Sequence, residues 1–292
     1  MRNALKVIWV LLVLVFVTRY SVSHRKELFD TLASFSAFVL IATVVTTMLG
    51  KVVIAIHSQL ITRVNGHRFS FRDSFWMYSA SDLVKYVPGG LWNAVARVRL
   101  YSTRGMTSTT ATKAFALEKY WMLMGALGTG ALALTGDLLH RIGWHLSGAG
   151  VWAVRALLFM FWIGLMWAGS RISGRHIHPK DLLRALLEQS VMAVFFGLGV
   201  AIPLSAVHAD ISVVTAIGAF SLGRGIGYVA VFAPAGIGVR EVVTLWAVNG
   251  GHGTTSSVLV IAMAMNRVMT LVADLASFGL SLVLRPSALV EE

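Results

Sequence analysis

Four polar side chains flank a helix-breaking stretch inside an otherwise apolar part of the chain. Asp82 and Lys85 lie three residues apart before Pro88-Gly89-Gly90, and Asn93 and Arg97 lie four apart after it. At these spacings each pair shares one face of a helical arm. The break frees backbone N–H and C=O groups that lipid cannot satisfy, so at membrane depth these groups must face protein, water or a polar ligand.

An anion is the ligand that this arrangement favours. Freed N–H groups and the positive end of a helix beginning near Asn93 attract phosphate, and Lys85 and Arg97 would add charge-assisted hydrogen bonds. The alternative is structural: a charge pair, a plain turn and an Arg97 side chain that reaches toward the interface. Ionisable groups inside a membrane are functional candidates by default, which favours the anion site.

A second break about half a chain later repeats the pattern. Here Pro234, Gly236 and Gly238 are followed at once by Arg240 and Glu241. Two such breaks in corresponding places are typical of transporters built from repeats. Glu241 is expected to pair with Arg240 or with an arginine of the other half, or to couple a proton.

The helix that follows each break also carries ionisable residues. Glu118 and Lys119 lie near the start of the first such helix. Asn266, Thr270 and Asp274 share one face of the second helix, where Arg267 lies two turns from Asp274. A polar stripe on a membrane helix faces the bundle or a wet cavity, and its structural alternative is helix packing with an Arg267–Asp274 ion pair.

Composition indicates a multi-pass membrane protein. Of 292 residues, 57% are hydrophobic and 13% charged, with a mean hydropathy of +0.74, whereas soluble domains are about 25% charged. The net charge of +12 falls in short clusters between apolar runs, as the positive-inside rule and anionic lipid explain, so no nucleic-acid partner is needed. There is no cysteine, which excludes disulfides and thiol chemistry.

Six apolar runs are long enough to cross a membrane, and two further segments are interrupted by the breaks. The expected spans are 4–20, 31–56, 113–135, 150–170, 184–204 and 256–284, and the interrupted segments are 70–101 and 211–250.

Basic clusters orient these segments. Because cytoplasmic loops carry excess Lys and Arg, each interrupted segment is expected to form a re-entrant hairpin, one from each side. The fold class is therefore all-α, a single transmembrane domain with inverted repeats over 1–140 and 150–285 and cytoplasmic termini. In the alternative topology, 211–232 crosses fully. The clusters taken as cytoplasmic contain Arg2, Lys6, Lys51, Arg63, Arg68, Arg72, Arg97, Arg99, Arg104, Lys113, Arg171, Arg175, Lys180 and Arg184.

Cofactor and metal motifs are missing from the sequence. Gly223-Arg224-Gly225-Ile226-Gly227 lacks the preceding strand and the full spacing of a dinucleotide loop, and its glycines suit close helix packing. No ATP-binding loop and no His-Glu-x-x-His motif occur. We therefore expect no cofactor, no metal site and no ATP-driven step.

With these residues in view, the chain resembles the flippase-like transmembrane domain of the lysylphosphatidylglycerol synthase family. The matching features are residues 85–92, the Arg97 region, Glu118 in Ala-Leu-Glu-Lys, and residues 234–241, although Ala235 replaces a glycine of the pattern. The resemblance implies a multi-pass protein of the bacterial inner membrane that moves an anionic or polyprenyl-phosphate lipid between leaflets. Aminoacyl transfer in that family needs a separate soluble domain, so none is expected here.

We therefore expect a flippase-like lipid transporter and not an enzyme. Two alternatives stay open: a membrane enzyme acting on a lipid-linked sugar or phosphate, with Asp82, Glu118 or Glu241 as its carboxylate, and a non-catalytic partner of a cell-envelope glycosyltransferase. The expected partners are membrane lipids, and the sequence leaves homo-oligomer formation open. The residues expected to bind the lipid head group are Asp82, Lys85, Pro88, Gly89, Gly90, Asn93, Arg97, Glu118, Pro234, Gly236, Gly238, Arg240, Glu241 and Arg267.

Overall fold

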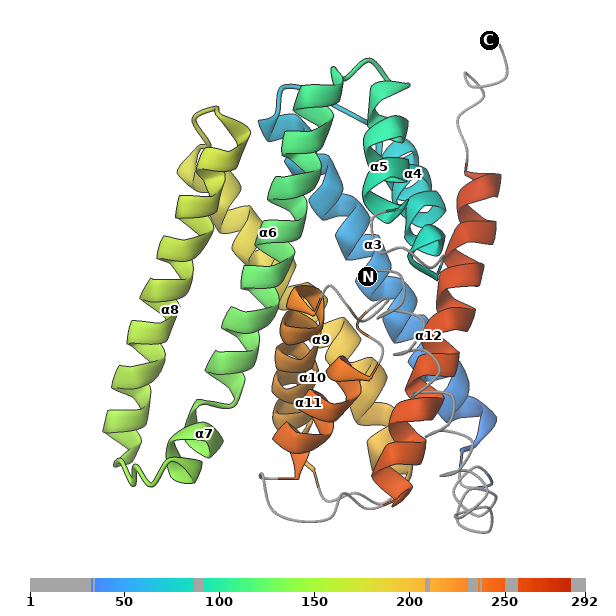
Figure 1. The fold of residues 1–292 in the computed structure, drawn as a ribbon. Helices are drawn as coiled ribbons and strands as arrows, with labels where there is room; N and C mark the ends of the chain where they lie inside the picture. The colour runs from blue at the N-terminus through green and yellow to red at the C-terminus, as the bar shows by residue number, and fades with distance from the viewer. Residues whose placement is uncertain are drawn as a thin grey trace, which may run out of the picture.

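The protein is an all-α, multi-pass membrane protein (Figure 1). The computed structural model describes residues 33, 35–86, 92–207, 211–230, 236, 238–249 and 257–284, and this part of the chain contains no strand. Its helices are α3 (Ala37–Val64), α4 (Phe71–Leu83), η1 (Val84–Tyr86), α5 (Trp92–Ser102), α6 (Ser108–Ala133), α7 (Thr135–Arg141), α8 (Gly148–Ser170), η2 (Arg171–Ser173), α9 (Pro179–Ala206), α10 (Val213–Val229), α11 (Val239–Val248) and α12 (Ser257–Val283).

The expected spans correspond to long helices wherever they fall on described residues. Four helices, α3, α8, α9 and α12, are long and apolar enough to cross a membrane, and the pair α6 and α7, bent by 69°, gives a fifth if it counts as one broken span. The expected first span, 4–20, lies outside the described residues.

Helix starts are encoded locally by hydroxyl side chains. Ser36, Ser70, Thr107, Ser147 and Ser212 each accept a hydrogen bond from a backbone N–H in the first turn of the helix that they precede. Such caps satisfy an otherwise unpaired donor and stabilise a helix by about 1 kcal/mol each. The polar residues between the apolar runs therefore fix where α3, α4, α6, α8 and α10 begin.

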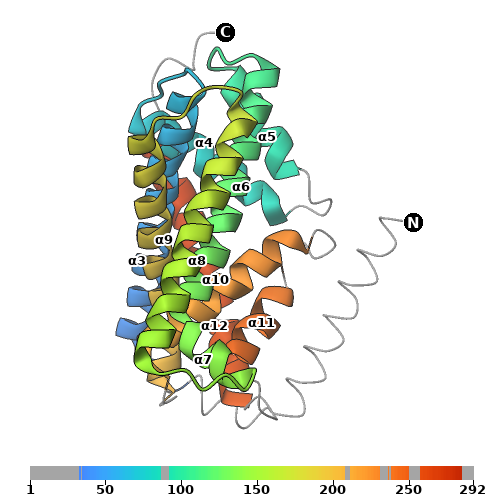
Figure 2. The same ribbon diagram turned by 90° about the vertical axis from the view of Figure 1, so that its left-hand side faces the viewer.

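Each interrupted segment folds as two short helices that occupy one half of the bundle. α4 and α5 lie in the upper half and α10 and α11 in the lower half, in both views (Figures 1 and 2). α10 has 17 residues and is about 26 Å long, at the lower limit for a membrane-spanning helix, so its length is compatible with both the paired hairpins and a full crossing by 211–232. Their re-entry into the membrane stays a prediction, and residues 87–91, 231–235 and 237 lie outside the described residues.

The two halves exchange packing partners. The first hairpin packs through α4 against α12, the second packs through α10 against α6, and α3 runs along α9 between them. Glycines allow the closest of these contacts: a Cβ on Gly130 of α6 would lie 2.8 Å from the backbone nitrogen of Leu222 in α10. Each hairpin therefore contacts a helix of the other half as well as helices of its own. The repeat boundaries themselves stay a prediction.

Apolar side chains divide between an interior cluster and the outer faces. Leu60, Leu117, Trp121 and Met166 are fully buried where α3, α6 and α8 meet. Most of the α8 side chains point outward instead, including several large apolar ones. An exposed apolar helix of this length suits a lipid-facing surface. On this side of the bundle, α8 therefore separates the polar interior from lipid.

Candidate functional site

Two lysines and two aspartates form a closed ring of ion pairs at the end of the first hairpin arm. Lys51 of α3 pairs with Asp82 at 2.7 Å and with Asp274 of α12, and Lys85 lies 2.8 Å from both aspartates. Tyr86 donates its hydroxyl to Asp274 at 2.5 Å. The ring joins α3, α4, η1 and α12, and its formal charge is zero.

Lys51 corrects one expectation from the sequence. It was counted among the cytoplasmic loop residues, but it lies inside α3 with 4% of its side chain exposed. The reason is that α3 runs from Ala37 to Val64, so Lys51 sits near its middle and needs the two carboxylates of the ring. An isolated lysine at that depth would be costly, and its position within an apolar run was the signal that could have revealed it.

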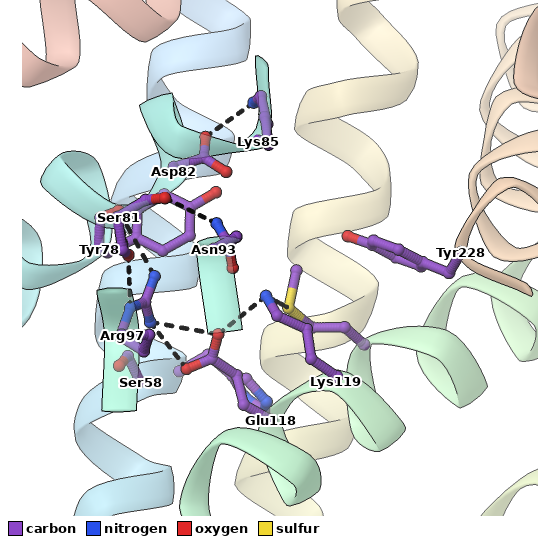
Figure 3. A network of polar contacts seen from close by, with 12 residues as sticks. Ser58, Tyr78, Ser81, Asp82, Lys85, Asn93, Arg97, Glu118, Lys119 and Tyr228 are labelled. Atoms are coloured by element: carbon purple, nitrogen blue, oxygen red, sulfur yellow. Dashed lines mark hydrogen bonds and ion pairs between the residues drawn. The ribbon is translucent and has the colours of Figure 1, made fainter. Parts of the chain in front are cut away.

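Arg97 and Glu118 form a second, fully buried ion pair below the ring (Figure 3). Arg97 Nη1 lies 3.0 Å from Glu118 Oε2, and Arg97 Nε donates to the Ser81 hydroxyl at 2.6 Å. The Tyr101 hydroxyl donates to Glu118 at 3.2 Å and contacts Ser58 at 2.7 Å. Arg97 is 0% exposed, so the structure places it within the bundle and not in a cytoplasmic loop or at the interface, and its charge is already neutralised.

Lys119 and Asn93 border this pair. Lys119 Nζ lies 3.1 Å from Glu118 Oε1 and keeps 31% of its side chain exposed. Asn93 Nδ2 donates to the Ser81 carbonyl at 2.8 Å, which ties the first turn of α5 to α4. Lys119 is therefore the accessible cation of this group, and Asn93 holds the two hairpin arms together.

The second hairpin carries its own charge cluster. Glu241 of α11 lies 2.5 Å from Arg267 of α12 and 3.4 Å from Arg240. The Gly238 backbone N–H donates to Glu241 Oε2 at 2.8 Å, which caps α11. Gly236 and Gly238 have φ of 68° and 86°, the left-handed region that glycine adopts without strain, so the glycines are needed to lead the chain into this cap.

These contacts decide between the pairings left open above. Arg267 pairs with Glu241 and not with Asp274, which is bound to the two lysines of the ring. Glu241 contacts arginines of its own half only, among the described residues. In each half, therefore, the arm after the break pairs with the helix that follows it, but the signs are reversed: Arg97 with Glu118, and Glu241 with Arg267.

Tyr228 at the end of α10 connects the two sides of the site. Its ring points from α10 toward Lys119 and the first hairpin (Figure 3), and its hydroxyl accepts from Arg224 Nε at 3.3 Å. Tyr228 was not among the residues predicted from the sequence. A tyrosine at a helix end carries no functional signal until the fold brings it opposite the other half.

A further polar chain was also missed. His57 of α3 is fully buried. Its Nδ1 lies 2.8 Å from a Glu188 carboxylate oxygen of α9, and its Nε2 lies 3.2 Å from the Gln189 amide nitrogen. Arg184 donates to the second Glu188 oxygen at 2.7 Å. Only the i, i+4 spacing of Arg184 and Glu188 on a helix hinted at this group.

The central site consists of ten ionisable side chains with a formal charge of +2. They are Lys51, Lys85, Arg97, Lys119, Arg240, Arg267, Asp82, Asp274, Glu118 and Glu241. Lys85, Lys119, Arg240 and Arg267 are partly exposed, whereas Arg97 and Lys51 are not. Within the described ranges, no group of three His, Asp or Glu side chains could hold a metal ion. Pro88, Gly89, Gly90 and Pro234 lie outside those ranges, so an anion bound by the N–H groups of the breaks stays a prediction.

Comparison with known proteins agrees with this architecture. The profile of the family described as the lysylphosphatidylglycerol synthase TM region matches residues 3–277, nearly the whole chain. A search of curated proteins finds no match. The helices, the two interrupted segments and the profile lead to one conclusion: the chain belongs to the family of the lysylphosphatidylglycerol synthase transmembrane region.

Proposed function

We propose that this protein is a lipid transporter of the flippase type, which moves an anionic phospholipid or a polyprenyl-phosphate lipid between the leaflets of the bacterial inner membrane. The observation that supports the proposal is the set of partly exposed cations from both halves, Lys85 and Lys119 on one side and Arg240 and Arg267 on the other. A phosphate needs such cations to leave water, because an unpaired charge inside a membrane is costly.

The carboxylates serve this function by keeping the cations in place. Asp82 and Asp274 hold Lys85, Glu118 holds Lys119, and Glu241 holds Arg267. A phosphate entering the site would share these cations with the carboxylates, so its charge would be compensated at each stage. The lipid chains would stay in the bilayer while the head group passes between the hairpins, and no bond of the lipid would be broken.

Leaflet exchange in liposomes tests the proposal. Purified protein would be reconstituted with trace head-group-labelled phosphatidylglycerol or a labelled polyprenyl phosphate, and label in the outer leaflet would be followed by chemical quenching. Wild type is expected to exchange at least one of these lipids faster than protein-free liposomes. Lys85→Gln and Arg267→Gln are expected to lose that exchange, whereas Arg171→Gln, an exposed arginine on η2, is expected to retain it.

Chemical analysis of the same lipids separates the proposal from its rivals. A new lipid product in the wild-type sample would contradict pure transport and indicate a membrane enzyme. Folded protein that neither exchanges nor alters either lipid would contradict both and leave a role as a partner of another envelope protein.

A further inference from the structure

Arg224 of α10 is a buried cation that pairs with no carboxylate among the described residues. Its residue surface is 9% exposed. The guanidinium stacks on Phe196 with 4.7 Å between its central carbon and the ring centroid, Nη2 lies 2.9 Å from Met192 Sδ, and Nε donates to Tyr228 at 3.3 Å. All of these partners are neutral.

This arrangement sets Arg224 apart from the six cations of the central site. Each of those lies within ion-pair distance of an aspartate or glutamate. A guanidinium held away from water without a counter-charge is costly to bury, and aromatic stacking compensates only part of that cost. An anionic ligand that binds next to Arg224 would supply the missing charge.

A small pocket lies beside the guanidinium. Arg224, Gln189 and Ser221 provide its polar lining, and Ala126, Ala193, Phe196 and Phe220 provide its apolar walls. Ser221 is 2% exposed and contributes a hydroxyl to this lining. The pocket therefore places a hydroxyl donor beside a buried cation that has no carboxylate partner among the described residues.

We propose that this pocket is an oxyanion subsite, in which Arg224 and Ser221 bind the phosphate of a lipid head group. Guanidinium groups bind phosphate through charge-assisted hydrogen bonds. Nε and Nη2 of Arg224 already contact Tyr228 and Met192, so Nη1 donates to the phosphate, and the Ser221 hydroxyl donates a second bond. The pocket has room for about one water-sized group, so it suits a single phosphate oxygen, with the rest of the head group and the lipid chains outside it. Tyr228 lies between the subsite and the central site, since its hydroxyl accepts from Arg224 and its ring points toward Lys119 (Figure 3).

The inference rests on the proposed function only for the source of the phosphate. A lipid head group and free phosphate present the same oxyanion, so the two sources are distinguished by experiment. Binding is also measurable without transport, so failure of the subsite and failure of the proposed function give different results.

The test measures binding to the purified full chain in a detergent without phosphate groups. Phosphatidylglycerol, a polyprenyl phosphate, inorganic phosphate and the neutral lipid dioleoylglycerol would be titrated against wild type, Arg224→Gln, Arg224→Lys and Ser221→Ala. Arg171→Gln is the matched control, because Arg171 also stacks on an aromatic ring, Trp167, but is exposed and lies outside the pocket. Melting temperatures without ligand are recorded in parallel.

We expect at least one phosphate lipid, but not dioleoylglycerol, to bind wild type and Arg171→Gln. Arg224→Gln should weaken binding by roughly tenfold or more and Ser221→Ala by several-fold, as losing charged and neutral hydrogen bonds predicts. Arg224→Lys should retain part of the affinity. The melting temperature of Arg224→Gln should not fall, because the change removes an uncompensated buried charge.

Equal affinity in wild type and Arg224→Gln would overturn the subsite. If Arg224→Gln is unstable, unchanged binding by both Ser221→Ala and Arg224→Lys would overturn it as well. Binding of inorganic phosphate alone, lost in Arg224→Gln, would support the oxyanion subsite and contradict a lipid as its source.

Discussion

Lys85 and Asp274 lie 2.8 Å apart although they belong to opposite halves of the chain. Lys85 ends the first hairpin arm, and Asp274 lies within the helix that follows the second hairpin. The contact therefore fixes the position of one hairpin relative to the other half, and it does so through a cation that keeps 25% of its side chain exposed.

The exposure of Lys85 distinguishes its role from that of Lys51, its buried neighbour in the same ring. Lys85→Gln is expected to reduce leaflet exchange of the transported lipid about tenfold or more while lowering stability by less than about 1 kcal/mol. Lys51→Gln removes the cation of the ring that water cannot replace, because its side chain is only 4% exposed, and is expected to cost about 3 kcal/mol or more. Exchange rates and thermal unfolding of both variants in the same lipid check this, and equal melting temperatures would contradict the distinction.

Breaking the Arg97–Glu118 pair is expected to affect folding first. Arg97→Gln leaves Glu118 buried without its main partner and should cost about 3–5 kcal/mol. The double variant Arg97→Gln with Glu118→Gln removes both charges, so it should be more stable than either single variant. Thermal unfolding of the four proteins forms a double-mutant cycle. Strictly additive losses would show that the pair is not coupled.

Glu241 is expected to matter more for stability than Arg267. Glu241→Ala removes the cap on the Gly238 N–H and the carboxylate that both Arg240 and Arg267 contact, whereas Arg267→Ala leaves Glu241 with Arg240. The difference in unfolding free energy should be about 1–2 kcal/mol. Chemical denaturation in mixed micelles measures it, with Glu241→Gln as a variant that retains a capping oxygen. The reverse order would contradict this account of the cluster.

Close packing of α6 against α10 predicts opposite effects at two glycines. A Cβ at Gly130 would meet the α10 backbone, while a Cβ at Gly164 of α8 meets nothing within 4 Å. Gly130→Ala is therefore expected to lower stability by about 1–3 kcal/mol. Gly164→Ala should be neutral or stabilise by up to about 1 kcal/mol, because alanine is the better helix former. Melting temperatures of the two variants decide whether α6 and α10 are in contact as described.

The absence of cysteine allows a direct test of orientation. The α8–α9 loop and α7 lie at opposite ends of the bundle (Figure 1), and His176 and Asp137 are exposed there. In oriented vesicles, a membrane-impermeant thiol reagent should label His176→Cys only from the cytoplasmic side and Asp137→Cys only from the other. Labelling of both from one side would contradict the arrangement drawn from the basic residues.

The helices and the two interrupted segments could be predicted because they depend on local sequence. Hydropathy placed the spans, and the hydroxyl caps lie at the starts of several helices. The spacing of Asp82 and Lys85 predicted that the two side chains share one face, and the structure pairs them at 2.8 Å, as the structural alternative for this stretch expected. These features need no knowledge of what lies elsewhere in the chain.

The ion-pair partners of the charged side chains could not be predicted from the sequence, because tertiary packing selects them. Arg97 was expected to bind phosphate, but the fold places Glu118 against it. Arg224 was considered only as part of a glycine-rich motif, and its lack of a carboxylate becomes visible only when its neighbours are known. A membrane interior makes such pairings decisive, since each charge must be compensated by a group that can be far away in sequence.

The exchange of packing partners between halves also constrains how the protein is made. While the chain is being synthesised, Lys51, Asp82 and Lys85 enter the membrane before α12, which carries Asp274, has left the ribosome. Until then these residues hold two positive charges against one negative charge, and α4 has no α12 to cover it. The nascent first half therefore carries an unbalanced charge inside the membrane, which the arrival of Asp274 on α12 compensates.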